Sequence, residues 1–501
     1  MDKIILDVLK EYRSPLIRVA QEKAFSGKTL IFGFGGVAKC SLPILLNKLN
    51  FDPKKITILD MKDKSKDLAP FTAKGVVFRH IKITRENLEK LLSEYLTSGD
   101  LLIDLAYNIG CTDIVTWCNK NNVNYVNTSI ELWDPYKAQE NKSPYERSLY
   151  YRHMQLRDLK IPKNAPTMIL DHGANPGLIS HFTKQGIFDI ANKVISDTPS
   201  SKLTDMLEQY RKNNEFNKLA MSLGIKTIHC SERDTQITDK PKQVNEFVGT
   251  WSVEGLHEEG MAPSEMGWGT HENWVPDFSN VPPEGPKNQI FLSQMGINTW
   301  VKSWVPDYEI IGMVIRHGEA FSISESLTVK ENDKVVYRPT VHYAYLPCDG
   351  TMNSLHELRC RNYQMPNTQR ILSEEIIEGS DILGALLMGH KYKAWWTGSI
   401  LDIHQAAKLV PGQNATTVQV AIGICSAIEW VLQNKNQGIC LPDDLPYDFI
   451  IEHSRGYLGN FVSIPTDWDP LQNHTIYFKN NKENDIDRAN LWSFKNFLFN
   501  D

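Results

Sequence analysis

Carboxylates and indole rings gather in one stretch of this sequence that contains no basic residue. Between Gln243 and Pro286 there is no lysine or arginine, although such residues are frequent elsewhere in the chain. The stretch carries many acidic residues and several tryptophans, namely Glu246, Glu254, Glu258, Glu259, Glu265, Glu272, Asp277, Glu284, Trp251, Trp268 and Trp274. Uncompensated carboxylates beside aromatic faces predict a pocket for a cation. An acidic, solvated surface loop is the alternative interpretation.

A second stretch has the spacing of a nucleotide-binding turn. Residues 33–38 read Gly-Phe-Gly-Gly-Val-Ala and lie between an apolar run and a helical pattern. Gly33 permits a tight turn, Gly35 lets backbone N–H groups approach a pyrophosphate, and the small Ala38 allows close helix packing. Asp60 ends the next apolar run, where a carboxylate accepts hydrogen bonds from ribose hydroxyls and repels a 2′-phosphate. The pattern predicts bound NAD rather than NADP, and a glycine turn without a ligand is the alternative.

A third candidate element follows the sixth apolar run, where residues 171–177 read DHGANPG. Asn175 as an N-cap and Pro176 at the first helical position predict that a helix begins there. Such a helix would start at the carboxyl edge of a parallel sheet, beside the expected nicotinamide, where a crevice ligand binds. The position favours a binding role over a purely structural cap.

A doubly wound α/β domain would position these residues. Short apolar runs, several of them rich in β-branched residues, predict buried parallel strands at 28–32, 56–60, 76–80, 101–104, 125–128 and 167–170. Helical patterns such as 86–96 lie between them, and Ser143, Pro144 and Glu146 form a capping-box start. We predict a Rossmann-type doubly wound parallel sheet with a second α+β domain for substrate binding and dimerisation.

The domain boundaries follow from these patterns. We predict a dinucleotide-binding domain at 1–175, a substrate-binding and dimerisation domain at 176–405, and a C-terminal segment at 406–501 that returns to the first domain. The apolar helical run at 416–432 suggests this return. The charged and helical segment 205–219 has no assigned role.

Composition excludes several classes of protein. The chain has 501 residues, 23% of them charged, and a net charge of -6, as expected of a soluble protein with two or three domains. Basic residues do not cluster, so no nucleic-acid partner is expected. Residues 1–13 lack a secretory apolar region, and 415–432 is too short and polar to span a bilayer. The eight cysteines form no CxxC pair and the histidines no HExxH motif, which favours reduced thiols in a cytoplasmic protein without a metal.

Several long motifs, in order along the chain, resemble those of the bacterial homospermidine synthases, relatives of the saccharopine dehydrogenases. They are HGANPG at 172–177, SERDTQ at 231–236, TWSVEG at 250–255, GWGT at 267–270, YRPTVHYAYLPC at 337–348 and QNAT at 413–416. The resemblance implies a homodimer that keeps NAD bound while two putrescines are joined and ammonia is released. It implies oxidation of an amine to an imine, exchange of the amine, and reduction of the new imine by the same cofactor.

The resemblance also implies roles for single residues. Trp251 matches an indole that binds the cationic substrate, and Glu232 and Glu259 match carboxylates that hold its ammonium groups. His317 is a candidate proton relay. The predicted catalytic set is Trp251, Glu232, Glu259, His317, Asn175 and Asp381. The structural alternative is core packing for Trp251, a surface ion pair for Glu232 and Glu259, and a purely structural role for His317.

Near the cofactor the match is looser. Asn108 stands where the family can have aspartate, which puts a charged role in doubt, and Glu131 and Trp133 are candidate rim residues. The predicted cofactor contacts are Gly33, Gly35, Gly36, Val37, Ala38, Asp60, Asn108, Thr128, Ala174 and Asn175.

Two other functions stay open at this point. An amino-acid dehydrogenase of the saccharopine type would present basic side chains to substrate carboxylates, and Arg233 and Arg316 are candidates for that role. A non-catalytic NAD-binding regulator would need no cation pocket. The patterns do not choose among putrescine, diaminopropane and spermidine as the preferred amine, nor do they name the general base.

Overall fold

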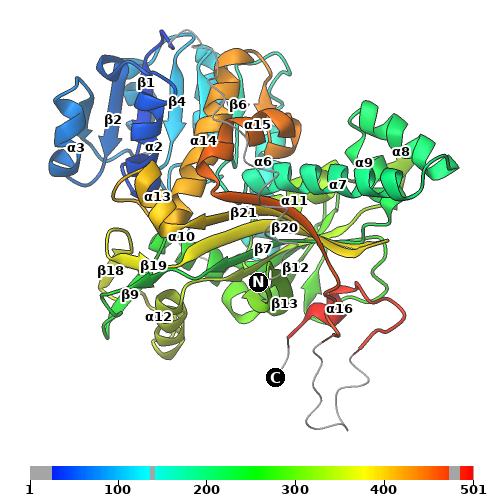
Figure 1. Cartoon of the computed structure of the whole chain (residues 1–501). Helices are drawn as coiled ribbons and strands as arrows, with labels where there is room; N and C mark the ends of the chain where they lie inside the picture. Colours follow the sequence, from blue (N-terminus) through cyan, green and yellow to red (C-terminus); the bar gives the residue numbers. More distant parts are fainter. Residues whose placement is uncertain (1–24, 136–140, 473–485, 500–501) are drawn as a thin grey trace.

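The computed structural model describes residues 25–135, 141–472 and 486–499, so the expectation for residues 1–13 lies outside the described part of the chain. Two large sheets organise the molecule (Figure 1). The first, in blue and cyan, lies in the upper part of the view, and the second runs across its middle.

The first sheet has seven strands, all parallel, in the order β22-β6-β5-β4-β1-β2-β3. Their bounds are β1 (Thr29–Phe32), β2 (Ile56–Asp60), β3 (Val77–His80), β4 (Leu101–Asp104), β5 (Asn124–Asn127), β6 (Met168–Ile169) and β22 (Ile439–Cys440). Six of these strands agree with the predicted ones to within a residue or two, and the predicted fold class is confirmed. Strand β22 has no counterpart among the predicted strands, since two residues carry no periodicity.

Helices α2 (Gly36–Asn47), α3 (Ser65–Thr72), α4 (Leu88–Tyr95), α5 (Cys111–Asn121) and α6 (Leu149–Asp158) belong to this part of the chain. Helix α4 confirms the predicted helix at 86–96 and buries Leu88, Leu91 and Leu92. That one-sided burial is what the spacing of its leucines dictates.

The predicted capping box at Ser143 does not begin a long helix. The Ser143 hydroxyl does donate to Glu146 at 2.8 Å, but one 3-10 turn follows it. Helix α6 begins at Leu149 instead, because Ser148 caps it and the distant Glu265 accepts the N–H of Leu149. A tertiary contact thus decides where the helix begins.

The second sheet is mixed and has ten strands. They are β7 (Thr227–Asp234), β10 (Pro263–Gly267), β11 (Ser279–Asn280), β12 (Gln289–Met295), β13 (Trp300–Val305), β14 (Tyr308–Met313), β17 (Thr340–Leu346), β20 (Ser380–His390), β21 (Lys393–Asp402) and β23 (Asn460–Thr466). Strand β7 lies in the middle, parallel to β17 and antiparallel to β20. Short pairs flank it: β8 (Ile237–Thr238) with β19 (Ile376–Glu378), β9 (Glu246–Gly249) with β18 (Thr368–Ile371), and β15 (Val329–Glu331) with β16 (Lys334–Tyr337).

The remaining helices surround the second sheet or join it to the first. They are α7 (Leu178–Asp197), α8 (Lys202–Lys212), α9 (Phe216–Leu223), α10 (Val253–Met261), α11 (Glu319–Ser326), α12 (Asp349–Cys360), α13 (Ile403–Leu409), α14 (Ala415–Gln433), α15 (Tyr447–Ser454) and α16 (Phe494–Phe497). Helix α7 packs on β20 and β21. The segment 205–219 falls in α8 and α9.

Helix α14 connects the two sheets. It packs on α2 and β5 on one side and on β20 and β21 on the other, and it matches the predicted helix at 416–432. Within the described residues it is the one helix long and apolar enough to cross a membrane, and 89% of its apolar window is buried inside the protein. A helix that is apolar all round and enclosed by protein is what a core position requires. The domain boundaries at 175 and 405 remain predictions.

Candidate active site

The glycine turn has the shape that a dinucleotide needs. Gly33 has φ +80°, and a Cβ there would lie 2.9 Å from the carbonyl oxygen of Leu105. Nothing lies within 4 Å of a Cβ built on Gly35, so the backbone is open to a close ligand. Ala38 is buried at the start of α2. The turn therefore fits a pyrophosphate at a helix N-terminus.

Asp60 stands at the carboxyl end of β2 and steadies this turn. Its Oδ2 accepts the backbone N–H of Phe34 at 2.7 Å, and its Oδ1 accepts that of Lys62 at 2.7 Å. Each carboxylate oxygen keeps a second lone pair that can accept a ribose hydroxyl. The position fits the predicted role in NAD binding.

The rim of the nucleotide site is built from the ends of β4 and β5. Asn108 has φ 61°, and its backbone N–H lies 3.3 Å from an oxygen of Glu131. The other oxygen of Glu131 accepts the Ser129 hydroxyl at 2.7 Å. Thr128 is half-buried beside this loop and Ala174 is buried. The remaining turn residues, Gly36 and Val37, are half-buried at the start of α2.

Asn175 does not cap a helix, which corrects the prediction. Helix α7 begins at Leu178 after Gly177, whose φ of 128° suits glycine. The Asn175 amide instead donates to Glu232 at 2.8 Å and to the Tyr343 hydroxyl at 2.6 Å. Because buried carboxylates demand donors, the side chain turns toward the second sheet. It thereby connects the edge of the first sheet with the middle of the second.

Three carboxyl groups lie together on β7 and β20, and we call Glu232, Asp234 and Asp381 the strand carboxylates. Glu232 and Asp234 are two residues apart on β7 and share one face, while Asp381 is directly opposite Asp234. All three are buried. Within the described residues none of them has an ion pair with lysine or arginine, and neither oxygen of Asp381 has a hydrogen-bond partner.

Burial and mutual repulsion favour protons on this cluster. The pKa of Glu232 is raised to about 7, because burial and the charge of Asp234 together outweigh the hydrogen bonds from Tyr343 and Asn175 and the charge of His317. Burial, followed by the charges of Glu232 and Asp234, raises the pKa of Asp381 well above its usual range. These groups titrate together. A cation placed among them would restore their negative charge.

An aromatic wall faces the cluster. Tyr343 and Tyr345 lie on β17, next to β7, with their rings stacked at 5.2 Å. The Tyr343 hydroxyl donates to Glu232. The indole N–H of Trp251 donates to the Tyr345 hydroxyl at 3.0 Å. Trp251 is half-buried and packs against the edge of the main apolar core, so part of its ring is open to a ligand.

His317 lies between two carboxylates. Its Nε2 is 3.0 Å from an oxygen of Glu259, and its Nδ1 is 3.5 Å from an oxygen of Glu319. Burial alone lowers the imidazole pKa, but the charges of Glu319 and Glu259 raise the pKa of His317 well above its usual value. The ring is also 4.3 Å from that of Tyr343. At neutral pH His317 is therefore an imidazolium, a donor rather than a base.

The acidic stretch from Gln243 to Pro286 is not an uncompensated cation pocket, which corrects that prediction. Cationic side chains from distant parts of the chain form ion pairs with several of its acids. Backbone N–H groups donate hydrogen bonds to others. The ion pairs are Glu246 with Arg370 at 2.8 Å, Glu258 with Arg152 at 2.6 Å, Glu258 with Arg316, and Glu259 with His317. Trp268 and Trp274 pack in the apolar cluster of the second sheet. From this stretch, Trp251 and Glu259 reach the candidate site.

Comparison with known proteins agrees with this geometry. The family model of the saccharopine dehydrogenase NADP-binding domain matches residues 29–169, and that of the saccharopine dehydrogenase C-terminal domain matches residues 173–461. The homospermidine synthase of Blastochloris viridis is 37% identical over 95% of this chain and 98% of its own length. The chain belongs to the homospermidine synthase family. The homospermidine synthase of Mesorhizobium japonicum is 35% identical over 94% of this chain and 96% of its own length.

A solved structure extends the likeness to three dimensions. The crystal structure of the homospermidine synthase from Legionella pneumophila in complex with NAD is 33% identical, covers 96% of this chain and 99% of that one, and gives a TM-score of 0.84. The resemblance drawn from the sequence motifs is confirmed.

Sequence reasoning missed four residues of the site: Asp234, Glu319, Tyr343 and Tyr345. Three of them could have been predicted from the sequence, because alternate side chains of a strand lie on the same face. Asp234 follows Glu232 by two positions in SERDTQ, and Tyr343 and Tyr345 alternate in YRPTVHYAYLPC. Glu319 carried no such signal.

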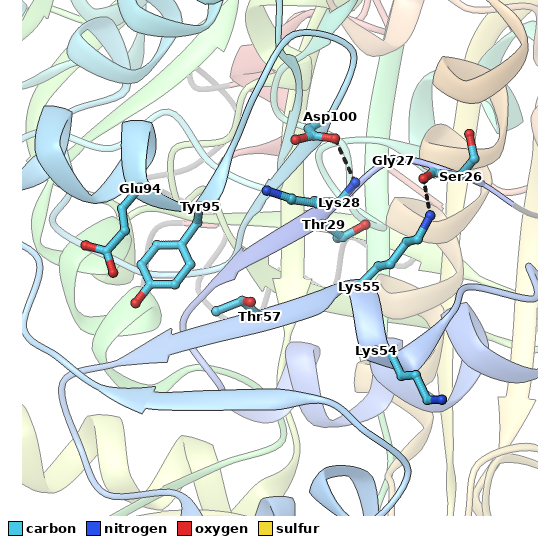
Figure 2. Close-up of a pocket in the computed structure, with 10 residues that line it drawn as sticks. All are labelled: Ser26, Gly27, Lys28, Thr29, Lys54, Lys55, Thr57, Glu94, Tyr95 and Asp100. Carbon is cyan, nitrogen blue, oxygen red and sulfur yellow. Dashed lines mark hydrogen bonds between the residues drawn. The ribbon is translucent and has the colours of Figure 1, made fainter.

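The pocket shown in Figure 2 lies away from these residues. It encloses about 460 Å³ at the amino ends of β1, β2 and β4, and its lining is Ser26, Gly27, Lys28, Thr29, Lys54, Lys55, Thr57, Glu94, Tyr95 and Asp100. Asp100 accepts the backbone N–H of Lys28 at 2.7 Å. Ligands of doubly wound sheets bind at the carboxyl ends of the strands, so this hollow is not part of the candidate site. Among the described residues no group of histidine, cysteine or acidic side chains is arranged to hold a metal ion.

Proposed function

We propose that this chain is a homospermidine synthase, an NAD-dependent aminobutyl transferase that joins two putrescines and releases ammonia. With spermidine as the donor of the aminobutyl group, the released product would be diaminopropane. The observation that carries the proposal is the buried set of strand carboxylates, which have no lysine or arginine partner in the described part of the chain and are joined through Asn175 to the edge of a dinucleotide-binding sheet. Membership in the homospermidine synthase family supports it.

The charges of the site complement a diamine. Putrescine carries two ammonium groups at neutral pH, because alkyl amines have pKa values near 10. Glu232 and Asp381 would bind one ammonium group, and Glu259 the other. The ring face of Trp251 would stabilise positive charge between them, worth about 0.5 to 2 kcal/mol for a desolvated cation. Without the substrate, the buried acids hold protons instead of a counter-ion.

NAD is the cofactor that the site would hold. Gly33, Gly35, Gly36, Val37 and Ala38 would cradle the pyrophosphate, Asp60 would accept the ribose hydroxyls, and Asn108, Thr128, Ala174 and Asn175 would line the path to the nicotinamide. When bound, NAD accepts a hydride from the amine carbon and later returns it to the new imine. The family model that matches this region is described as NADP-binding, but the Asp60 carboxylate would repel a 2′-phosphate.

The side chains around the amine would manage protons and water. One ammonium group must lose a proton before its carbon can be oxidised. Glu232, with a pKa of about 7, is suited to accept it. His317, held as an imidazolium by Glu259 and Glu319, would donate a proton toward departing ammonia. The aromatic wall of Trp251, Tyr343 and Tyr345 would keep water from an imine, whose hydrolysis would yield an aldehyde.

The saccharopine-type alternative is not favoured by the arginines named for it. Arg316 is buried and paired with Glu258, and it also donates to the carbonyl of Arg147. Arg233 donates to the carbonyl of Pro347 at 2.7 Å and pairs with Asp349 at 3.2 Å. Neither guanidinium is left for a substrate carboxylate. A regulator without catalysis would not need the strand carboxylates at all.

The assembly and the compartment are proposed from the family resemblance and from the cysteines. We infer a homodimer from the family resemblance, and a cytoplasmic location from the eight cysteines, all of which are free thiols.

The decisive experiment is product analysis of the purified protein with putrescine and catalytic NAD. We expect homospermidine and ammonia in equal amounts, with no NADH absorbance that grows in proportion to product, because the hydride returns in every turnover. NADH released in step with putrescine consumed would mark an ordinary amine dehydrogenase and refute the proposal.

A further inference from the structure

Asp234 differs from its two neighbours among the strand carboxylates. Asp381 has no hydrogen-bond partner within the described residues, whereas Asp234 uses both of its oxygens. Its Oδ1 accepts the backbone N–H of Gln236 at 2.9 Å and the Gln236 amide at 3.0 Å. Its Oδ2 accepts the Thr250 hydroxyl at 2.6 Å. Three of the four lone-pair positions of Asp234 are therefore used by the protein itself.

We propose that Asp234 and Asn414 are positioning residues that clamp Thr250 and thereby set the place of the Trp251 indole; the inference rests on the proposed function. Thr250 directly precedes Trp251 and is held from two sides. Asp234 accepts its hydroxyl, and the Asn414 amide donates to its carbonyl at 2.6 Å. The same amide donates to the carbonyl of Leu372 at 2.6 Å.

The indole makes few specific contacts, so its position depends on the backbone of the neighbouring residue. Its N–H donates to the Tyr345 hydroxyl at 3.0 Å. On its other side, a Cβ on Gly255 would lie 2.9 Å from the indole Cζ3, so Gly255 lets the ring pack against helix α10. A ring on a half-buried loop residue keeps its place only if the peptide that carries it is fixed.

The same hydrogen bonds connect the Trp251 loop with the start of α14, which lies beside the glycine turn of the nucleotide site. The Asn414 side chain caps α14, because its Oδ1 accepts the N–H of Thr417 at 2.7 Å. Gln236 accepts the backbone N–H of Ala415 at 2.9 Å. A Cβ on Gly36 would meet the Thr417 methyl at 3.6 Å. Two residues at the start of α14 therefore make these contacts. Thr417 lies beside the glycine turn, and Asn414 binds the loop that carries Trp251.

This network accounts for three motifs at once. Asp234 and Gln236 come from SERDTQ, Thr250 from TWSVEG, and Asn414 from QNAT. These segments are distant in the sequence and meet through buried hydrogen bonds. Buried and fully satisfied polar networks fix a unique local geometry.

The test removes the clamp without touching the carboxylates. Thr250→Val keeps the shape and loses the hydroxyl, whereas Thr250→Ser keeps the hydroxyl. Asn414→Asp keeps the helix cap and loses both donations. We expect Thr250→Val and Asn414→Asp to lower kcat/KM for putrescine about 10-fold to 100-fold, while Thr250→Ser stays within about threefold. Ser354→Ala, which removes another buried hydroxyl bonded to strand β9, is the matched control and should keep full activity.

The readout that separates positioning from general stability is a double-mutant cycle with Trp251→Phe. If the hydroxyl acts through the indole, Thr250→Val should cost far less in the Trp251→Phe background than in the parent. Equal fold losses in both backgrounds would overturn the proposal.

A second readout does not depend on activity. The emission of Trp251 is the difference between the parent and Trp251→Phe spectra, and in the Thr250→Val background we expect it to shift to the red and to be quenched more by acrylamide. An unchanged difference spectrum would overturn the clamp even if the protein made no homospermidine. Absence of homospermidine from the parent enzyme would refute the proposed function alone.

Discussion

Two acidic regions of this protein look alike in composition and behave differently. Glu258, from the stretch 243–286, has a pKa of about 2, because two arginines outweigh the effect of its burial. Glu232, one of the strand carboxylates, has a pKa of about 7, because burial outweighs the hydrogen bonds that it accepts. The protein itself neutralises Glu258 but does not neutralise Glu232. The number of acids in a segment thus says little about whether that segment binds a cation.

The difference assigns separate roles to the two regions. A buried ion pair whose partners are both present costs the fold little, but removing one partner leaves a buried charge. Unpaired buried carboxyl groups stay protonated until a ligand brings positive charge. We therefore expect the loss of Glu258 to affect folding and the loss of Glu232 to affect binding.

The largest effect is expected for Glu258→Gln. Removing this carboxylate leaves the buried guanidinium of Arg316 without its partner, so the free energy of unfolding should fall by about 3 to 5 kcal/mol. Urea denaturation followed by circular dichroism would measure it. Asp381→Asn is the matched contrast, since it removes a buried acid without an ion-pair partner and should leave the ligand-free protein at least as stable. A Glu258→Gln protein with unchanged stability would break the comparison.

Glu232→Gln should have the next largest effect, on catalysis rather than folding. A buried carboxylate that pairs with a ligand charge contributes about 2 to 5 kcal/mol, so kcat/KM for putrescine should fall between about 30-fold and several thousand-fold. Steady-state kinetics and thermal denaturation would be compared in one set of preparations. Glu254→Gln, a change in the acidic stretch at a residue bonded to Gln369, should stay near the parent on both measures. Full activity in Glu232→Gln would remove this residue from the site.

A smaller effect is expected at Trp251. If the ring face binds the cation, activity should fall in the order Trp, Phe, Ala, because the quadrupole is weaker in phenylalanine and absent in alanine. The loss from Trp to Phe should be within about 0.5 to 2 kcal/mol of transition-state stabilisation, and thermal stability should change far less than turnover. Equal losses of stability and activity in both variants would return Trp251 to a packing role.

The smallest effect is a pH dependence of substrate affinity. The raised pKa of Glu232 means that the folded, ligand-free protein binds a proton that the unfolded chain releases between pH 4.5 and about 7. Its contribution to stability is therefore lost as pH rises through that window. Putrescine needs the ionised form, so the upward shift in Tm that it causes should grow several-fold from pH 6 to pH 8. Glu232→Gln should flatten this trend, and a trend that survives the change would assign it to another group.

Much of the first sheet was predictable because its signals are local. Each strand from 28–32 to 167–170 lies in a short apolar run, and the glycine turn follows the first of them directly. The helix starts were less predictable. Ser143 has the right residues for a cap, yet α6 begins at Leu149 because Glu265, more than a hundred residues away, accepts its N–H group.

The sequence by itself determined the doubly wound sheet, the nucleotide turn with Asp60, and the family to which the chain belongs, because each rests on residues adjacent along the chain. Only the tertiary structure decided which acidic side chains have a basic partner and which do not. Glu258 meets Arg316 after 58 residues of separation, and Asp381 meets Asp234 through the pairing of β20 with β7. The electrostatic free energy of a buried carboxyl group depends on its neighbours in space. Composition therefore pointed to the acidic stretch, whereas packing brought the strand carboxylates together on β7 and β20, outside it.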